Sequence, residues 1–305
     1  MFGAAGSGLL FSASLAVPFI GFVAGFLAAV PLCYTRLSSG RRATLLAMLI
    51  AALALGGGFK PPIGGWYLLQ CGLIGLLLPE FIVRGLGSFR ALLWTTAIAA
   101  TASAVMAFGM AMSAGQDLFT MAQQEITTGM GQAMQLYEQQ KGLSPQDLET
   151  IRQGMQTVAA TLIRIFPALG CLNVLLIGAV TLLFLRRMAS QRGLALSIAP
   201  FSDFRVPEIV IWLLIAAGFS MLAPTTLLTT PALNIIVILT VLYFCQGLAV
   251  LLTLAGRTSY AGLLKVMLTF LLLLQPYLLP VVAILGIFDL WGDFRTPRPK
   301  QEENL

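Results

Sequence analysis

Long apolar runs without charged residues recur along the whole chain, separated by short polar segments. A helix that crosses a bilayer needs about 20 mostly apolar residues. The pattern therefore predicts about eight membrane-spanning helices, within a range of roughly seven to nine. The expected spans cover residues 9–34, 43–59, 61–83, 91–115, 158–185, 208–226, 231–256 and 266–289.

Prolines mark two runs that could be divided. Pro18 could split the first run into two shorter helices, and the Gln275–Pro276 pair could break the last one. A break at Gln275 would bring the basic tail after Asp289 to the cytoplasmic side, whereas eight unbroken spans place both termini outside. The side of the tail therefore stays open.

Basic residues gather in alternate loops. Loops rich in Lys and Arg face the cytoplasm, so the odd-numbered loops are expected there. These loops contain Arg36, Arg41, Arg42, Arg84, Arg90, Arg186, Arg187, Arg192, Arg205, Arg257 and Lys265.

The segment 116–157 is the one long polar stretch, and it joins the fourth and fifth expected spans. Its pattern predicts two helices that form an extracytoplasmic hairpin. Ser144 suits the N-cap of the second helix, with Pro145 at its first position and Asp147 in its first turn. The hairpin is either a solvated extension of the spans or a lid or docking surface that uses its methionines.

Composition supports an all-α polytopic membrane bundle, taken as one domain over residues 1–305. Of these residues 58% are hydrophobic and 10% are charged, whereas soluble domains contain about 25% charged residues. A single soluble domain and a disordered chain are both excluded. The net charge of +6 lies in short loops, so it indicates orientation in the membrane and not nucleic-acid binding.

Catalytic constellations are missing from the sequence. The chain has no histidine, which is the commonest proton shuttle and metal ligand. Four cysteines lie far apart in apolar stretches and are expected as buried thiols, with no disulfide or zinc site. Glu80 lies four residues before Arg84, which predicts an ion pair on one helix face. We expect that the protein is not an enzyme and that it binds no cofactor and no metal ion.

Uncharged polar residues inside the spans are the candidate ligand-binding residues. In lipid they must find hydrogen-bond partners, so they should face the bundle interior. They either join helices or line a pocket for a small neutral or apolar ligand, and those on the last two spans are expected to converge. The candidates are Gln70, Asn173, Asn234, Gln246 and Gln275.

A G-x-x-x-G pattern lies on the first apolar run, at Gly21 and Gly25. Glycines at this spacing allow two helices to approach closely. The pattern indicates helix packing within the chain, with a homodimer face as the alternative.

Two motifs near the C-terminus carry a family resemblance. The first runs from Tyr243 to Val250 and contains Gln246 and Gly247. The second is Gly286-Ile-Phe-Asp289-Leu-Trp291-Gly-Asp293-Phe-Arg295. Together with the pattern of the N-terminal region, they resemble the YybS-like family of bacterial integral membrane proteins of unknown function. The resemblance covers nearly the whole chain.

The resemblance implies a multi-pass protein of the bacterial cytoplasmic (inner) membrane with no established activity. It also implies a weaker, fold-level similarity to the S components of energy-coupling-factor transporters. Those proteins bind vitamins or metals in a helical bundle and depend on a separate ATPase module. No ligand motif of an S component matches residues of this chain.

Two functions are expected. The first is a non-enzymatic small-molecule-binding or transport component, with a pocket between spans that the 116–157 hairpin roofs. The second is a membrane scaffold or assembly partner for another envelope protein, which uses the hairpin or the Gly21–Gly25 face. The expected partners are the lipid bilayer, a small ligand, an ATPase module or envelope protein, and a second copy of the chain.

Overall fold

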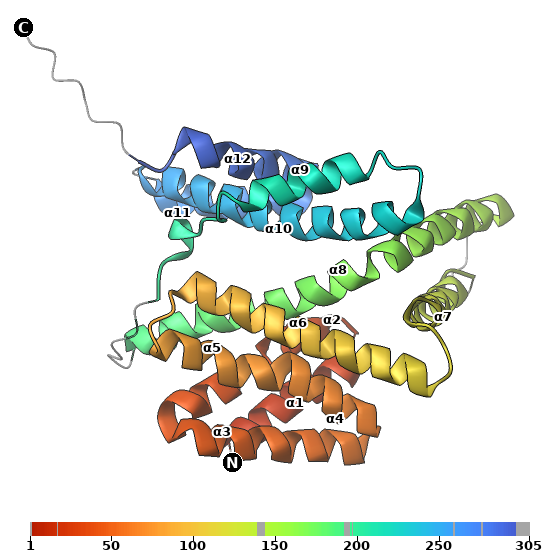
Figure 1. The fold of residues 1–305 in the computed structure, drawn as a ribbon, viewed down its shortest axis with the longest axis horizontal. Coiled ribbons are helices and arrows are strands. Elements are labelled where there is room, and N and C mark those ends of the chain that lie inside the picture. Colours follow the sequence, from red (N-terminus) through yellow and green to blue (C-terminus); the bar gives the residue numbers. More distant parts are fainter. Residues whose placement is uncertain are drawn as a thin grey trace, which may run out of the picture. The chain divides into compact units, whose positions relative to one another are not determined.

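The computed structural model describes residues 2–16, 18–138, 144–191, 196, 198–258, 260–275 and 277–296. Regular secondary structure in this part of the chain is entirely helical (Figure 1). The chain divides into two compact units, Met1–Ile198 and Ala199–Leu305. The expected all-helical fold is therefore confirmed, and each unit is described separately.

Unit 1 contains eight α-helices and one π-helical turn among its described residues. They are α1 (Phe2–Ala16), α2 (Pro18–Leu27), α3 (Val30–Gly58), α4 (Pro61–Tyr67), the π turn (Leu68–Gly72), α5 (Leu73–Val83), α6 (Ser88–Ser113), α7 (Leu118–Glu138) and α8 (Pro145–Gln191).

The first apolar run does not form one helix. The residues of the expected span 9–34 belong to α1, α2 and the start of α3. Pro18 begins α2, because proline lacks the N–H that would continue the preceding helix. A second break follows at Ala28–Ala29, where Pro31 lies in the first turn of α3. The division at Pro18 that the sequence allowed is thus present.

The basic residues expected in a loop between the first two spans lie within a helix instead. α3 continues through Arg36, Arg41 and Arg42, and its one non-helical residue is Gly40, with φ 83° and ψ 179°. Glycine adopts a positive φ without the steric cost that a side chain would add. The loop is therefore a kink, and the helix restarts directly after it.

Small residues bring the helices of unit 1 close together. A Cβ atom on Gly75 would lie 2.5 Å from Cβ of Leu32 on α3. A Cβ atom on Gly21 would lie 2.5 Å from the carbonyl oxygen of Ala13 on α1, and one on Gly25 would lie 3.2 Å from Cβ of Ser14. Gly21 and Gly25 therefore lie where α2 approaches α1 of the same chain closely.

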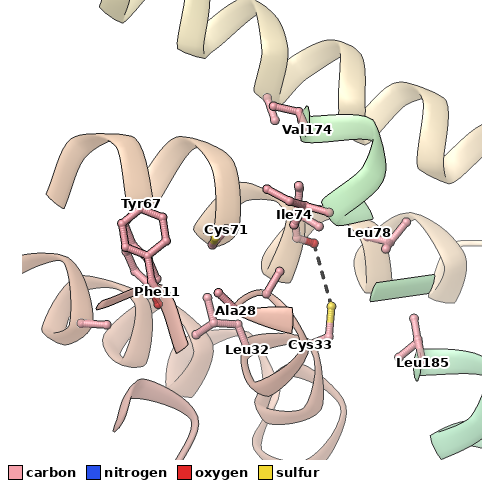
Figure 2. Packing of buried hydrophobic residues seen from close by; sticks show 14 of the residues in the cluster. Phe11, Ala28, Leu32, Cys33, Tyr67, Cys71, Ile74, Leu78, Val174 and Leu185 are labelled. Atoms are coloured by element: carbon pink, nitrogen blue, oxygen red, sulfur yellow. Dashed lines mark hydrogen bonds between the residues drawn. The ribbon is translucent and has the colours of Figure 1, made fainter. Parts of the chain in front are cut away.

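The core of unit 1 is built from residues of α1, α3, α4, the π turn, α5, α6 and α8, part of which Figure 2 shows. The rings of Phe11 and Tyr67 pack edge to face, with centroids 5.3 Å apart. The Ser7 hydroxyl donates a 2.6 Å hydrogen bond to the Ala28 carbonyl, so it accepts the 2.7 Å hydrogen bond from the Tyr67 hydroxyl. Cys33 and Cys71 are buried thiols here, as expected.

The two helices expected in segment 116–157 are present and pack against each other. α8 has 47 residues, so the second hairpin helix continues directly into the fifth apolar run. Ser144 Oγ accepts a 3.1 Å hydrogen bond from the Asp147 amide, and Ser144 Oγ donates to the Asp147 carboxylate at 2.7 Å. The expected cap of this helix is confirmed.

Unit 2 contains a short 3₁₀ turn and four α-helices among its described residues. They are the turn η2 (Phe201–Asp203), α9 (Val210–Ser220), α10 (Thr226–Gly256), α11 (Ala261–Leu274) and α12 (Leu278–Gly292). Within the expected span 208–226, α9 covers only 11 residues, and Thr226 already begins α10. The expected span 266–289 is interrupted after Leu274, which is the alternative that the Gln275–Pro276 pair suggested.

Five of the described helices are long and apolar enough to cross a membrane. They are Pro61–Val83, Ser88–Ser113, Gln146–Gln191, Thr226–Gly256 and the segment Val23–Gly58, which includes the break at Ala28–Ala29 and the kink at Gly40. Four shorter apolar helices accompany them, at Gly3–Ala16, Val210–Ser220, Ala261–Leu272 and Leu278–Gly292. These lengths define the class of protein as a membrane protein with several apolar helices.

Candidate functional site

A buried polar cluster lies between α10 and α12 of unit 2. Arg295 Nη2 donates a 2.6 Å hydrogen bond to Asp289 Oδ2, and Gln246 Nε2 donates to the same oxygen at 3.2 Å. The side chains of Asp289 and Arg295 are 0% and 7% exposed. We call these three residues the Gln246–Asp289–Arg295 cluster.

The cluster also binds the backbone that precedes α9. Arg295 Nη1 donates to the carbonyl oxygens of Ser202 and Phe204, at 2.8 Å each. Gln246 Oε1 accepts a 2.8 Å hydrogen bond from the Val206 amide. The segment 202–206 is therefore fixed to both α10 and α12 through side chains of the cluster.

Close helix contact makes this arrangement possible. A Cβ atom on Gly247 would overlap the Val282 carbonyl, and one on Gly286 would lie 2.7 Å from the Gly247 amide nitrogen. The two glycines thus allow the backbones of α10 and α12 to meet one turn from Asp289. A side chain on either glycine would push apart the helices that carry Gln246 and Asp289.

A left-handed residue turns the chain back after α12. Asp293 has φ 37°, and this conformation places Arg295 against the end of its own helix. The Asp293 carboxylate lies 2.6 Å from Arg205 and accepts a hydrogen bond from Thr296. The hydrogen bonds from Thr296 and Arg205 lower the pKa of Asp293 below its ordinary value.

Two polar atoms of the cluster have no hydrogen-bond partner among the described residues. They are Asp289 Oδ1 and Arg295 Nε. A buried ion pair is stable only when hydrogen bonds compensate the cost of removing both charges from water. The hydrogen bonds from Arg295 to the carbonyls of Ser202 and Phe204 provide that compensation. We therefore assign the cluster the role of holding segment 202–206 against α10 and α12.

The motif residues singled out in the sequence fall mostly on this cluster. Gln246, Gly247, Gly286 and Asp289 meet at the α10–α12 contact, while Asp293 and Arg295 close the turn. Trp291, by contrast, is 69% exposed.

The other polar candidates have separate partners. Asn173 Nδ2 donates to Gln70 Oε1 at 3.3 Å, and Gln70 lies in the π turn. Asn234 donates to the Thr230 carbonyl of its own helix at 2.9 Å. Gln275 is exposed at the end of α11. The expected convergence of Asn234, Gln246 and Gln275 is therefore wrong. The first binds a carbonyl of its own helix, the second binds Asp289, and the third is exposed.

The ion pair expected at Glu80 is present and has a third member. Arg84 lies 2.8 Å from Glu80 Oε1, and Arg36 of α3 contacts Glu80 Oε2. Sequence spacing identified Arg84, which is four residues away, but could not identify Arg36, which is 44 residues away.

An apolar groove of about 840 Å³ lies between α1 and α3 of unit 1. Most of its wall is aliphatic, and its hydroxyl groups come from Ser12, Thr35 and Ser39. No candidate from the sequence lies in it. Its lining includes Leu9 and Ser12 of α1, and Ser39, Leu46, Ile50 and Ala54 of α3 with Phe59 directly after that helix.

A second cavity, of about 590 Å³, lies within the α7–α8 hairpin. Three methionines line it, Met130 and Met134 from α7 and Met155 from α8. The ion pair between Glu138 and Arg152, at 3.2 Å, joins the two helices beside it. Methionine side chains adapt to irregular partners, so this cavity is suited to a variable apolar surface.

Comparison with known proteins agrees with this class. Residues 7–290 match the model of a family described as predicted membrane proteins, DUF2232. The chain therefore belongs to that family. No curated protein and no solved structure matches the chain.

Proposed function

We propose that this protein is a non-enzymatic membrane component that binds or transports a small molecule with an apolar body. The observation that carries the proposal is the α1–α3 groove, because its volume and aliphatic wall suit such a ligand. The proposed ligand site thus lies outside the uncharged polar set. Within that set Gln70, Asn173, Asn234 and Gln246 hydrogen-bond to other groups of the protein.

The topology is part of the proposal. The alternating basic loops favour a multi-pass protein of about eight spans in the bacterial cytoplasmic membrane, with the α7–α8 hairpin on the extracytoplasmic side. In this arrangement the protein would act as the fold-level similarity to the S components of energy-coupling-factor transporters implies. A separate ATPase module would then supply the energy for transport.

Native mass spectrometry of the gently extracted protein tests the ligand site. The wild type should retain a small molecule of defined mass. Ala54→Phe should lose it, because the new ring fills the groove at an exposed lining position. Ala97→Phe on α6 is the matched control, since Ala97 is also exposed and does not line the groove. Equal retention by all three proteins would contradict the proposal.

A scaffold role is the second candidate, and the methionine-lined cavity of the hairpin favours it. Under this hypothesis an envelope protein docks against α7 and α8. Deletion of residues 120–152 should release a partner that co-purifies with the wild type. A partner that stays bound to the deletion variant would show that the hairpin is not its docking site.

A further inference from the structure

We infer that the occupant of the α1–α3 groove is an anionic phospholipid, whose phosphate binds Arg42 and whose acyl chain lies along the groove. This inference rests on the proposed function, because it names the class of ligand for the same site. It is carried by the position of Arg42 relative to the groove wall.

Arg42 belongs to the same row of α3 as the groove wall. Residues four apart in a helix lie on one face, and Leu46, Ile50 and Ala54 of this row all line the groove. Arg42 is the next member of the row toward Gly40. Arg41 belongs to the adjacent row with Leu45 and Leu49, which do not line the groove.

Arg42 is also available for a ligand. It is exposed, and the ion pairs of the described residues do not include it. Arg36, in contrast, binds Glu80. The guanidinium of Arg42 therefore places an uncompensated positive charge at one end of an apolar surface, which is the charge complement of a phosphate.

A hydroxyl group lies close to Arg42 in the sequence at this end of the groove. Ser39, which lines the groove, precedes Arg42 by three residues and is exposed. The lining residues that follow, from Ala43 to Phe59, are all apolar. Along this wall the groove thus changes from a cation and a hydroxyl to hydrocarbon, as the polarity does along a phospholipid.

The dimensions of the groove suit an acyl chain. The helix from Arg42 to Phe59 extends about 25 Å at 1.5 Å per residue, which exceeds the half-thickness of about 15 Å of a hydrocarbon core. Arg42 also lies in a segment that the positive-inside rule assigns to the cytoplasmic face. Basic pockets between helices on that face bind anionic headgroups.

The test is a titration of the full-length, delipidated protein in detergent, followed by native mass spectrometry. The probes are phosphatidylglycerol and phosphatidylcholine with identical acyl chains. We expect phosphatidylglycerol to bind the wild type about fivefold more tightly. Both headgroups contain a phosphate, but the choline ammonium of phosphatidylcholine cancels its charge, so only phosphatidylglycerol offers Arg42 a net negative headgroup. Arg42→Gln should remove this preference, Arg42→Lys should keep part of it, and Arg41→Gln should leave it unchanged.

The possible outcomes distinguish the claim that the groove binds a ligand from the claim that the ligand has an anionic headgroup. If Ala54→Phe weakens binding of both lipids but the wild type does not prefer phosphatidylglycerol, the groove is a ligand site and the anionic headgroup is wrong. An equal loss of preference in Arg41→Gln and Arg42→Gln also overturns the assignment to Arg42, as it indicates diffuse attraction. If Ala54→Phe weakens neither lipid, the proposed ligand site fails as well. Retention of phosphatidylglycerol in excess inorganic phosphate is expected, and displacement by phosphate would contradict a lipid ligand.

Discussion

Arg295 Nη2 lies 2.6 Å from Asp289 Oδ2, and these two charged side chains are almost completely buried. The two residues are six positions apart in the sequence, where α12 ends and the chain turns back. Since Arg295 also binds two carbonyls of segment 202–206, the pair connects three parts of unit 2 through one guanidinium.

Arg295→Gln should strongly destabilise the protein, because it leaves the Asp289 carboxylate buried without its partner. Breaking a buried ion pair in this way costs about 3–5 kcal/mol. The midpoint of reversible unfolding in mixed micelles measures the loss. The double variant Arg295→Gln, Asp289→Asn should recover part of the lost stability. If Arg295→Gln melts like the exposed control variant Arg187→Gln, the account is contradicted.

Gly247→Ala should separate α10 from α12, since the added methyl group would overlap the Val282 carbonyl. We expect a loss of at least about 1–3 kcal/mol from overpacking. Gly218→Ala on α9 is the matched control, because a Cβ atom there has no neighbour within 4 Å. Equal stabilities of the two variants would show that the helices do not cross at Gly247.

The Asp293 carboxylate should make the stability of unit 2 depend on pH. Hydrogen bonds from Thr296 and Arg205 lower its pKa, so its contribution is complete above the ordinary value of about 3.9. That contribution is lost as the pH falls through the lowered pKa. The melting temperature of the wild type should therefore exceed that of Asp293→Asn at neutral pH, and the two should converge in strong acid. If the two melting temperatures still differ by the same amount at about pH 2, ionisation of Asp293 is not the cause of the difference.

Ser144→Ala should loosen the start of α8 by about 1 kcal/mol, because it removes both hydrogen bonds between Ser144 and Asp147 that involve the hydroxyl. The expected result is faster proteolysis near residue 144. Thr150→Ala removes a hydroxyl bonded only to its own helix and should be cut at the wild-type rate. The same rate in all three proteins would argue against the cap.

Local patterns predicted the helices and the hairpin well, because apolar runs and caps depend on neighbours in the sequence. The Ser144 cap and the break at Pro18 are examples. The partners of Gln70 and Glu80 could not be predicted, since Asn173 and Arg36 are 103 and 44 residues away. Such contacts depend on how helices cross.

The groove and the turn at Asp293 were missed for physical reasons. The groove arises where α1 crosses α3, and no single segment shows that crossing in its sequence. A positive φ at Asp293 is unusual for a residue other than glycine, so the return of Arg295 toward Asp289 had no strong local signal. In the sequence, only the charged residues of the C-terminal motif indicated that this end of the chain forms a defined structure.

The most direct test of the central claim is photo-crosslinking in the native membrane from benzoylphenylalanine at Ile50, which lines the groove. The account predicts an adduct of lipid size at Ile50, and a smaller yield of it in the Ala54→Phe background. The same reporter at Met134 examines the hairpin cavity in parallel. Capture of a protein at Ile50 with no small-molecule adduct would contradict the claim that this groove binds a ligand.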